Sequence, residues 1–138
     1  MDKSIRIILV DDSLGIRLVA KKLFHNLGYQ SVEVLEDGFK ALELMERQEF
    51  DLALIDWSMP KMSGLELLER IRKHEKWADL PVLLVTAIEE PLELMEALRA
   101  GADNYMTKPY DANQIEEKIR QVFEFREKKA GRHPTPDF

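Results

Sequence analysis

The chain has 138 residues, of which 45% are apolar and 33% charged, a balance typical of one folded globular domain and not of a disordered segment. Acidic residues outnumber basic ones by 26 to 20, and the formal net charge of −6 argues against a chain built mainly to bind nucleic acid. The absence of cysteine excludes disulfides, thiolate metal sites and cysteine nucleophiles. Since no apolar run approaches the roughly 20 residues of a membrane span and the N-terminus is no signal peptide, we expect a cytoplasmic protein.

Five short apolar runs, which we predict to be strands, alternate with five longer segments along the chain. The runs are Ile5–Val10, Ser31–Leu35, Leu52–Ile55, Pro81–Val85 and Asp103–Met106. The first, third and fourth runs are continuous instead of alternating, which is typical of strands that are covered on both faces. Strand–helix alternation repeated five times predicts an α/β fold: a parallel sheet with right-handed crossovers and helices on both faces.

The segments between the runs carry the periodicity and the end signals of helices. Apolar residues recur at helical spacing over Ile16–Leu27 and again over Ile115–Phe123. Ser13 is placed to cap the first helix and Gly28 to end it. The other signals are a turn before the second helix, a proline in the first turn of the fourth and a glycine that can close the fourth: Asp37-Gly38, Pro91 and Gly101.

Polar side chains follow four of the predicted strands, at the edge where an open parallel sheet binds its ligands. Asp11 and Asp12 follow the first run, and Asp56 follows the third. Thr86 follows the fourth run, and Lys108 comes two residues after the fifth. Clustered carboxylates repel one another unless a cation intervenes, and a site made only of oxygen ligands suits Mg²⁺ or Mn²⁺.

These residue types suit phosphoryl transfer. A divalent ion would leave one carboxylate able to act as a nucleophile, while the ion, the Lys108 ammonium and the Thr86 hydroxyl hold the phosphoryl group. Each residue alone also has an ordinary explanation: Asp12 could cap the first helix, Asp56 could cap a turn, and Lys108 could be solvated. Their joint placement at the strand ends favours the functional interpretation.

Four stretches of the sequence carry a resemblance to a known family. They are Ile-Leu-Val-Asp-Asp at 8–12, Leu-Ile-Asp-Trp-Ser-Met-Pro-Lys-Met-Ser-Gly-Leu-Glu-Leu-Leu at 54–68, Pro-Val-Leu-Leu-Val-Thr-Ala at 81–87 and Ala-Gly-Ala-Asp-Asn-Tyr-Met-Thr-Lys-Pro-Tyr at 100–110. Over roughly residues 5 to 125 the chain resembles the CheY-like receiver domains of bacterial two-component response regulators. The resemblance implies a doubly wound flavodoxin-like (βα)5 fold with strand order 2-1-3-4-5. It implies that residues 1–128 form a receiver domain, and the two prolines and few apolar residues of 129–138 predict a flexible tail or the start of a linker.

The resemblance also implies roles at the acidic cluster. Asp56 would be the phosphoacceptor, supplied by a histidine kinase, a phosphotransfer protein or a small phosphodonor. Asp11 and Asp12 would form the acidic pocket for Mg²⁺ (or Mn²⁺), with Asp12 the more direct ligand. Asp56 and the backbone carbonyl of Ser58 would complete the protein ligands.

The same resemblance implies a conformational switch. Lys108 would pair with the phosphoryl oxygens, and the Lys108–Pro109 peptide bond would be cis. Thr86 would move toward the phosphoryl group, and the Tyr105 ring would turn inward into the space that Thr86 leaves. This would change the face formed by the fourth helix, the last strand and the last helix. The alternative is that Tyr105 is an ordinary strand aromatic with its hydroxyl in water.

Two further positions would tune the lifetime of the phosphoryl group in this family, namely Ser58 and Ile88. Ile88 is apolar where a polar side chain could orient an attacking water, so it should shield the acyl phosphate. The alternative is that Ile88 is a loop residue packed on the fourth helix.

We therefore expect a signalling module that is no enzyme apart from catalysing its own phosphorylation and dephosphorylation. It would regulate a downstream protein, for example one of the chemotaxis type, as a monomer or a phosphorylation-induced dimer, without binding nucleic acid or membrane. One alternative is the N-terminal fragment of a larger regulator with a DNA-binding or enzymatic output domain. A second alternative is an aspartyl-phosphate phosphohydrolase. Such enzymes carry an Asp-x-Asp motif after the first strand, whereas the two aspartates here are adjacent.

Overall fold

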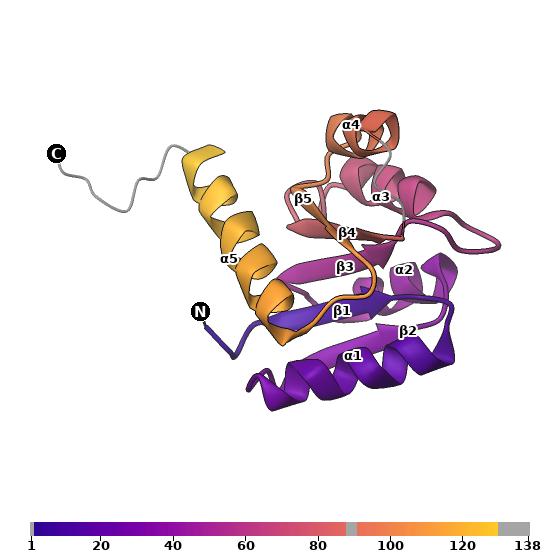
Figure 1. Ribbon diagram of the computed structural model, residues 1–138. Coiled ribbons are helices and arrows are strands. Elements are labelled where there is room, and N and C mark those ends of the chain that lie inside the picture. Colours follow the sequence, from indigo (N-terminus) through magenta and orange to yellow (C-terminus); the bar gives the residue numbers. More distant parts are fainter. Residues whose placement is uncertain (1, 88–90, 130–138) are drawn as a thin grey trace, which may run out of the picture.

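The computed structural model describes residues 2–87 and 91–129, over which five strands alternate with five helices (Figure 1). In chain order the elements are β1 (Arg6–Val10), α1 (Leu14–Asn26), β2 (Ser31–Leu35), α2 (Gly38–Arg47), β3 (Leu52–Asp56), α3 (Gly64–Lys73), β4 (Val82–Thr86), α4 (Pro91–Arg99), β5 (Asn104–Thr107) and α5 (Ala112–Lys129). Within these residues no helix is both long and apolar enough to cross a bilayer.

The five strands form one parallel sheet in the order β2-β1-β3-β4-β5, which confirms the predicted fold class. Helices α1 and α5 cover one face of the sheet, and α2, α3 and α4 cover the other (Figure 1). Alternate residues of a strand point to opposite faces, so Ile7 and Leu9 pack under α1 and α5, while Ile8 and Val10 pack under the other layer. Both sets are buried, which explains why the central runs are continuously apolar.

Most strands begin or end one residue away from the predicted ranges. β3 and β4 extend through Asp56 and Thr86, which are therefore the last strand residues and not the first loop residues. β5 covers Asn104–Thr107, one residue later than predicted. The backbone ladder continues beneath these polar side chains, since the Trp57 N–H still donates to the Val85 carbonyl at 2.8 Å. Side-chain polarity therefore marks the end of a strand less sharply than backbone pairing does.

The predicted helix ends are confirmed by capping contacts. The Ser13 hydroxyl accepts a hydrogen bond from a first-turn N–H of α1, and the Asp37 carboxylate does the same for α2. Pro91 is the first residue of α4. Gly28 and Gly101 follow α1 and α4 with φ of +100° and +111°, a backbone conformation that strongly favours glycine.

A buried ionic cluster anchors the start of β5. The Asp103 carboxylate, 1% exposed, accepts a hydrogen bond from the Val82 N–H at 2.8 Å. Arg72 of α3 and Arg126 of α5 each donate to the same carboxylate, at 3.2 Å and 3.0 Å. Arg72 also donates to the Gly101 carbonyl, at 2.8 Å and 2.9 Å. One carboxylate thus joins α3, α5 and the first residues of β4 and β5.

Replacing Asp103 should therefore destabilise the fold strongly. Asp103→Ala leaves two arginines, each with a side chain only 15% exposed, without their carboxylate. We expect a loss of about 3–5 kcal/mol in the free energy of unfolding, measured by urea denaturation. Asp79→Ala is the matched control, because Asp79 faces the same Arg126 from a fully exposed position and should change stability by less than about 1 kcal/mol. Equal losses in the two variants would contradict this role for Asp103.

Candidate functional site

Three carboxylates from two neighbouring strands meet at the carboxyl edge of the sheet. Asp11 and Asp12 directly follow β1, and Asp56 ends β3. Because β1 and β3 are paired side by side, an oxygen of each carboxylate lies within 4.8 Å of the other two. Asp11 and Asp56 are buried, whereas Asp12 is exposed. The edge thus presents a set of oxygen ligands that opens to solvent on the side of Asp12.

Lys108 is the cation of this cluster. Its Nζ lies 2.9 Å from Asp11 Oδ2 and 3.1 Å from Asp56 Oδ1. Although burial opposes the charged form, the hydrogen bonds to Asp11 and Asp56 raise the pKa of Lys108 above its ordinary value. One ammonium cannot neutralise three carboxylates, so the site favours binding a further cation.

The Asp56 carboxylate is held in an unfavourable environment. Burial raises its pKa from 3.8 to about 6, and the charge of Asp11 adds to the rise. Hydrogen bonds from Lys108 and from the backbone of Ser58 partly offset this effect. The ionised carboxylate is therefore poorly solvated. A bound cation, or a new bond to phosphorus, would reduce the cost of this buried negative charge.

A tight loop after β3 positions the Asp56 backbone. A Cβ at Gly64 would lie 2.2 Å from the Asp56 carbonyl oxygen, so only glycine fits at the start of α3. The Gly64 N–H donates to the Trp57 carbonyl at 2.9 Å, and the Ser63 hydroxyl caps α3. Lys61 lies within the same loop at φ +70°. Ser58, the proposed carbonyl ligand, is exposed in this loop.

The residues of the predicted switch lie on β4, which is next to β3, and on β5, which is next to β4. Thr86 is buried at the end of β4, and the Lys108 N–H donates to its carbonyl at 2.8 Å. Tyr105 of β5 is half-buried and lies opposite Leu84 of β4. The Lys108–Pro109 bond is cis, the isomer that the resemblance implied. The remaining predicted position, 88, lies outside the described residues.

Two residues at the site are not predicted by the sequence analysis. Arg17 donates from α1 to the Asp11 carbonyl at 2.7 Å. Its position, one helical turn after the cap Ser13, is the signal that could have placed it beside the first loop. Tyr110 directly follows Pro109. Burial is the main cause that raises the pKa of Tyr110 to about 12, and the charges of Asp11 and Asp56 add to the rise.

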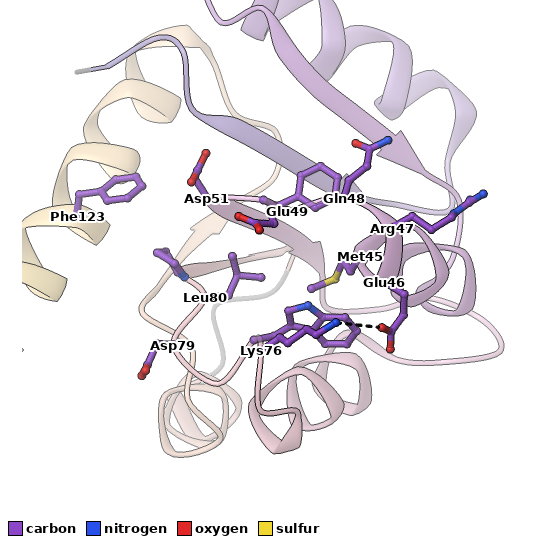
Figure 2. A pocket seen from close by; sticks show the side chains of 13 residues that line it. Met45, Glu46, Arg47, Gln48, Glu49, Asp51, Lys76, Asp79, Leu80 and Phe123 are labelled. Atoms are coloured by element: carbon purple, nitrogen blue, oxygen red, sulfur yellow. Dashed lines mark ion pairs between the residues drawn. The ribbon is translucent and has the colours of Figure 1, made fainter.

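A separate cavity of about 770 Å³ lies at the opposite, amino-terminal edge of the sheet (Figure 2). Its lining includes Met45 and Trp77 as well as charged side chains. The carboxylate of Glu46 lies 4.0 Å from the Lys76 ammonium, and Asp51 pairs with an arginine of β1 at 3.2 Å. No residue of the predicted phosphoryl site lines this cavity, so the two features are independent.

The raised pKa of Asp56 makes the metal-free protein sensitive to pH. The carboxyl group titrates near 6 in the folded state and near 3.8 when unfolded, so its charge destabilises the fold at pH 7, and this cost disappears as the pH falls below about 4. We expect Asp56→Asn to stabilise the metal-free protein by about 1–3 kcal/mol at pH 7.5, and hardly at all at pH 4. Urea denaturation in EDTA measures this, with exposed Asp79→Asn as the control. A destabilised Asp56→Asn protein at pH 7.5 would refute the expectation.

Comparisons with known proteins agree with this geometry. Residues 7–120 match the model of the response regulator receiver domain. Chemotaxis protein CheY-3 of Vibrio cholerae is 36% identical over 124 residues, which cover 90% of this chain and 95% of that protein.

Among solved structures, chemotaxis protein CheY4 of Vibrio cholerae superimposes with a TM-score of 0.82 at 28% identity, covering 86% of this chain and 98% of that one. The receiver domain of sensor histidine kinase PA1611 from Pseudomonas aeruginosa, solved with a magnesium ion in its active-site cleft, has a TM-score of 0.78 at 27% identity, covering 87% and 98%. The chain belongs to the response regulator receiver family, as a CheY-like receiver domain.

Proposed function

We propose that the chain stores a phosphoryl group on Asp56 and thereby switches its contacts with a downstream signalling protein. One observation carries this proposal: the Lys108 ammonium lies about 3 Å from both buried carboxylates while Asp12 stays exposed beside them. An ammonium in that position can pair with phosphoryl oxygens next to the nucleophile. The exposed side of the cluster leaves a path for a phosphodonor.

The donor set fits Mg²⁺ or Mn²⁺ as the cofactor. Both prefer oxygen ligands and keep several waters, and Asp11, Asp12 and Asp56 offer three oxygens with one open side. The similar PA1611 receiver domain is described with magnesium in its active-site cleft. We propose that these three residues and the Ser58 carbonyl hold the ion. When bound, it would neutralise charge on the carboxylates and the phosphoryl oxygens.

The proposed reaction moves one phosphoryl group. A carboxylate oxygen of ionised Asp56 attacks phosphorus, an O–P bond forms, and the bond from phosphorus to the donor's histidine nitrogen or acyl oxygen breaks. The donor leaves with that electron pair. Lys108 pairs with the phosphoryl oxygens as their charge spreads. Dephosphorylation is a separate step, in which water attacks the same phosphorus, the bond from the Asp56 oxygen to phosphorus breaks, inorganic phosphate leaves and the carboxylate is regenerated.

The surface next to the site supports a protein as phosphodonor. The large apolar side chains of Leu14, Leu18 and Val19 on α1 are each about 60% exposed. A groove of about 560 Å³ runs between α1 and the segment that contains Pro109 and Tyr110. We propose that a histidine kinase or phosphotransfer protein covers this apolar surface while its phosphohistidine reaches Asp56.

The proposed output surface lies around β5. Thr86 and Tyr105 line one small cavity together with Trp57, so a movement of Thr86 toward a phosphoryl group would open room for the tyrosine ring. The ring would then alter the surface of α4, β5 and α5, where Leu92, Met95 and Leu98 of α4 are exposed. A monomer and a phosphorylation-induced dimer both remain compatible with this surface. The cytoplasmic location and the role of residues 129–138 as tail or linker stay predictions of the sequence.

Intact mass spectrometry after incubation with acetyl phosphate tests the phosphoacceptor. We expect one added phosphoryl group on the wild-type chain, dependent on Mg²⁺, and none on Asp56→Asn. Asp79→Asn, which removes an exposed carboxylate at the opposite, amino-terminal edge of the sheet, should be modified like wild type. An adduct that persists in Asp56→Asn would show that the nucleophile is misassigned, and Asp11 and Asp12 would be tested next.

The apolar side chain at position 88 should lengthen the life of the phosphoryl group. We expect Ile88→Glu to lose the group faster than wild type, because a carboxylate there can orient the attacking water. Ile88→Leu keeps the apolar character and should decay at the wild-type rate. The decay of the phosphorylated mass after removal of the donor gives all three rates. A rate in Ile88→Glu that equals or falls below the wild-type rate would contradict the shielding role.

A further inference from the structure

A carboxylate oxygen of α4 is buried without a hydrogen bond to the residues that the structure describes. Glu93 lies in the first turn of the helix, and its Oε2 atom is buried yet accepts no hydrogen bond from the described residues. Buried polar atoms are nearly always hydrogen-bonded, and a carboxylate oxygen left without a donor is costly. Within the part of the chain that the structure describes, the atom is therefore an acceptor that lacks a donor.

Glu93 lines the same small cavity as the switch residues. The cavity measures about 10 Å³, roughly the space of one water molecule. Its walls come from β3, β4, α4 and β5: Trp57, Leu84, Thr86, Glu93, Leu94, Ala97 and Tyr105. A carboxylate can only accept, and a tyrosine hydroxyl can donate. The residue that lacks a donor thus lies beside the ring proposed to turn inward.

A second contact holds the Tyr105 ring in its present place. The Lys118 ammonium of α5 lies 4.9 Å from the centroid of the ring, within the range of a cation–π interaction. β5 runs between α4 and α5 (Figure 1). Tyr105 therefore lies between a cation on one helix and a carboxylate on the other.

We propose that Glu93 is a positioning residue for Tyr105: when the ring turns inward, its hydroxyl donates a hydrogen bond to Glu93 Oε2. The inward position replaces the contact with Lys118 by a charge-assisted hydrogen bond. The two contacts favour opposite ring positions, and their balance sets how far the protein is switched before and after phosphorylation. This inference rests on the proposed function, in which the Tyr105 ring turns inward, and adds that Glu93 and Lys118 set the preferred position of that ring.

NMR of the tyrosine rings in the full chain tests the inference, with Mg²⁺ and beryllofluoride as the stand-in for the phosphoryl group. The Tyr105 signals are assigned with Tyr105→Phe. We expect beryllofluoride to shift the Tyr105 ring inward in wild type. The ratio of inward to outward rings should be about tenfold lower in Glu93→Gln, because the acceptor there is neutral. It should be lowest in Glu93→Leu, because that variant has no acceptor. Glu96→Gln, an exposed glutamate of the same helix, removes the same charge and should behave like wild type.

Two further measurements separate positioning from a general effect on α4. Lys118→Gln should raise the inward population without beryllofluoride, because it removes the opposing contact. Glu93→Gln should weaken beryllofluoride binding in the wild-type background but not in Tyr105→Phe, which lacks the donating hydroxyl. Equal losses of affinity in the two backgrounds would overturn the inference.

The outcomes distinguish this inference from the proposed function. If beryllofluoride binds and the Tyr105 ring responds equally in wild type, Glu93→Gln and Glu93→Leu, Glu93 does not position the ring and water satisfies its oxygen. The proposed function then stands. If the wild-type chain neither binds beryllofluoride nor takes a phosphoryl group from acetyl phosphate, the proposed function fails and this inference fails with it.

Discussion

The position of the Lys108 ammonium between two buried carboxylates is the constraint on which the rest of the site depends. Asp11 and Asp56 lie on neighbouring strands and are removed from water, so without a cation their charges would oppose the folding of that edge. Lys108 contacts both at about 3 Å but cannot neutralise all three acids. The edge is therefore stable enough to form and still negative enough to attract a divalent ion. This residual imbalance explains why the same residues suit a metal and then an anionic phosphoryl group.

The parallel sheet connects this charge cluster to a surface some distance away. β4 lies between β3 and β5, so Thr86 is beside Asp56 on one side and near the Tyr105 strand on the other. The Asp103 cluster holds the first residues of β4 and β5 together with α3 and α5. Because that end of β5 is anchored, the switch that we propose near Thr86 would involve side chains and not a shift of the strand. In our proposal, Glu93 and Lys118 favour opposite positions of the Tyr105 ring.

Local patterns in the sequence were sufficient for the elements and most of their ends. Ser13 and Gly28 bound α1 as predicted, because capping and the left-handed glycine conformation depend on a few neighbouring residues. The ends of β3 and β4 were predicted one residue short, because backbone pairing between distant strands continues past the last apolar side chain. Asp103 was predicted as a strand residue. It instead precedes β5 and serves two arginines 31 and 23 positions away in the chain.

The sequence by itself determined the fold class, the family resemblance and which polar residues stand at the ends of the strands, because periodicity and short motifs are local properties of the chain. Only the tertiary structure decided the separations of Lys108 from Asp11 and Asp56, and with them the raised pKa of Asp56. It alone revealed, on either side of Tyr105, the Lys118 ammonium and a buried Glu93 oxygen that accepts no hydrogen bond from residues 2–87 or 91–129. These features depend on how side chains from separate elements pack against one another and exclude water, and no repeat or spacing along the chain encodes that.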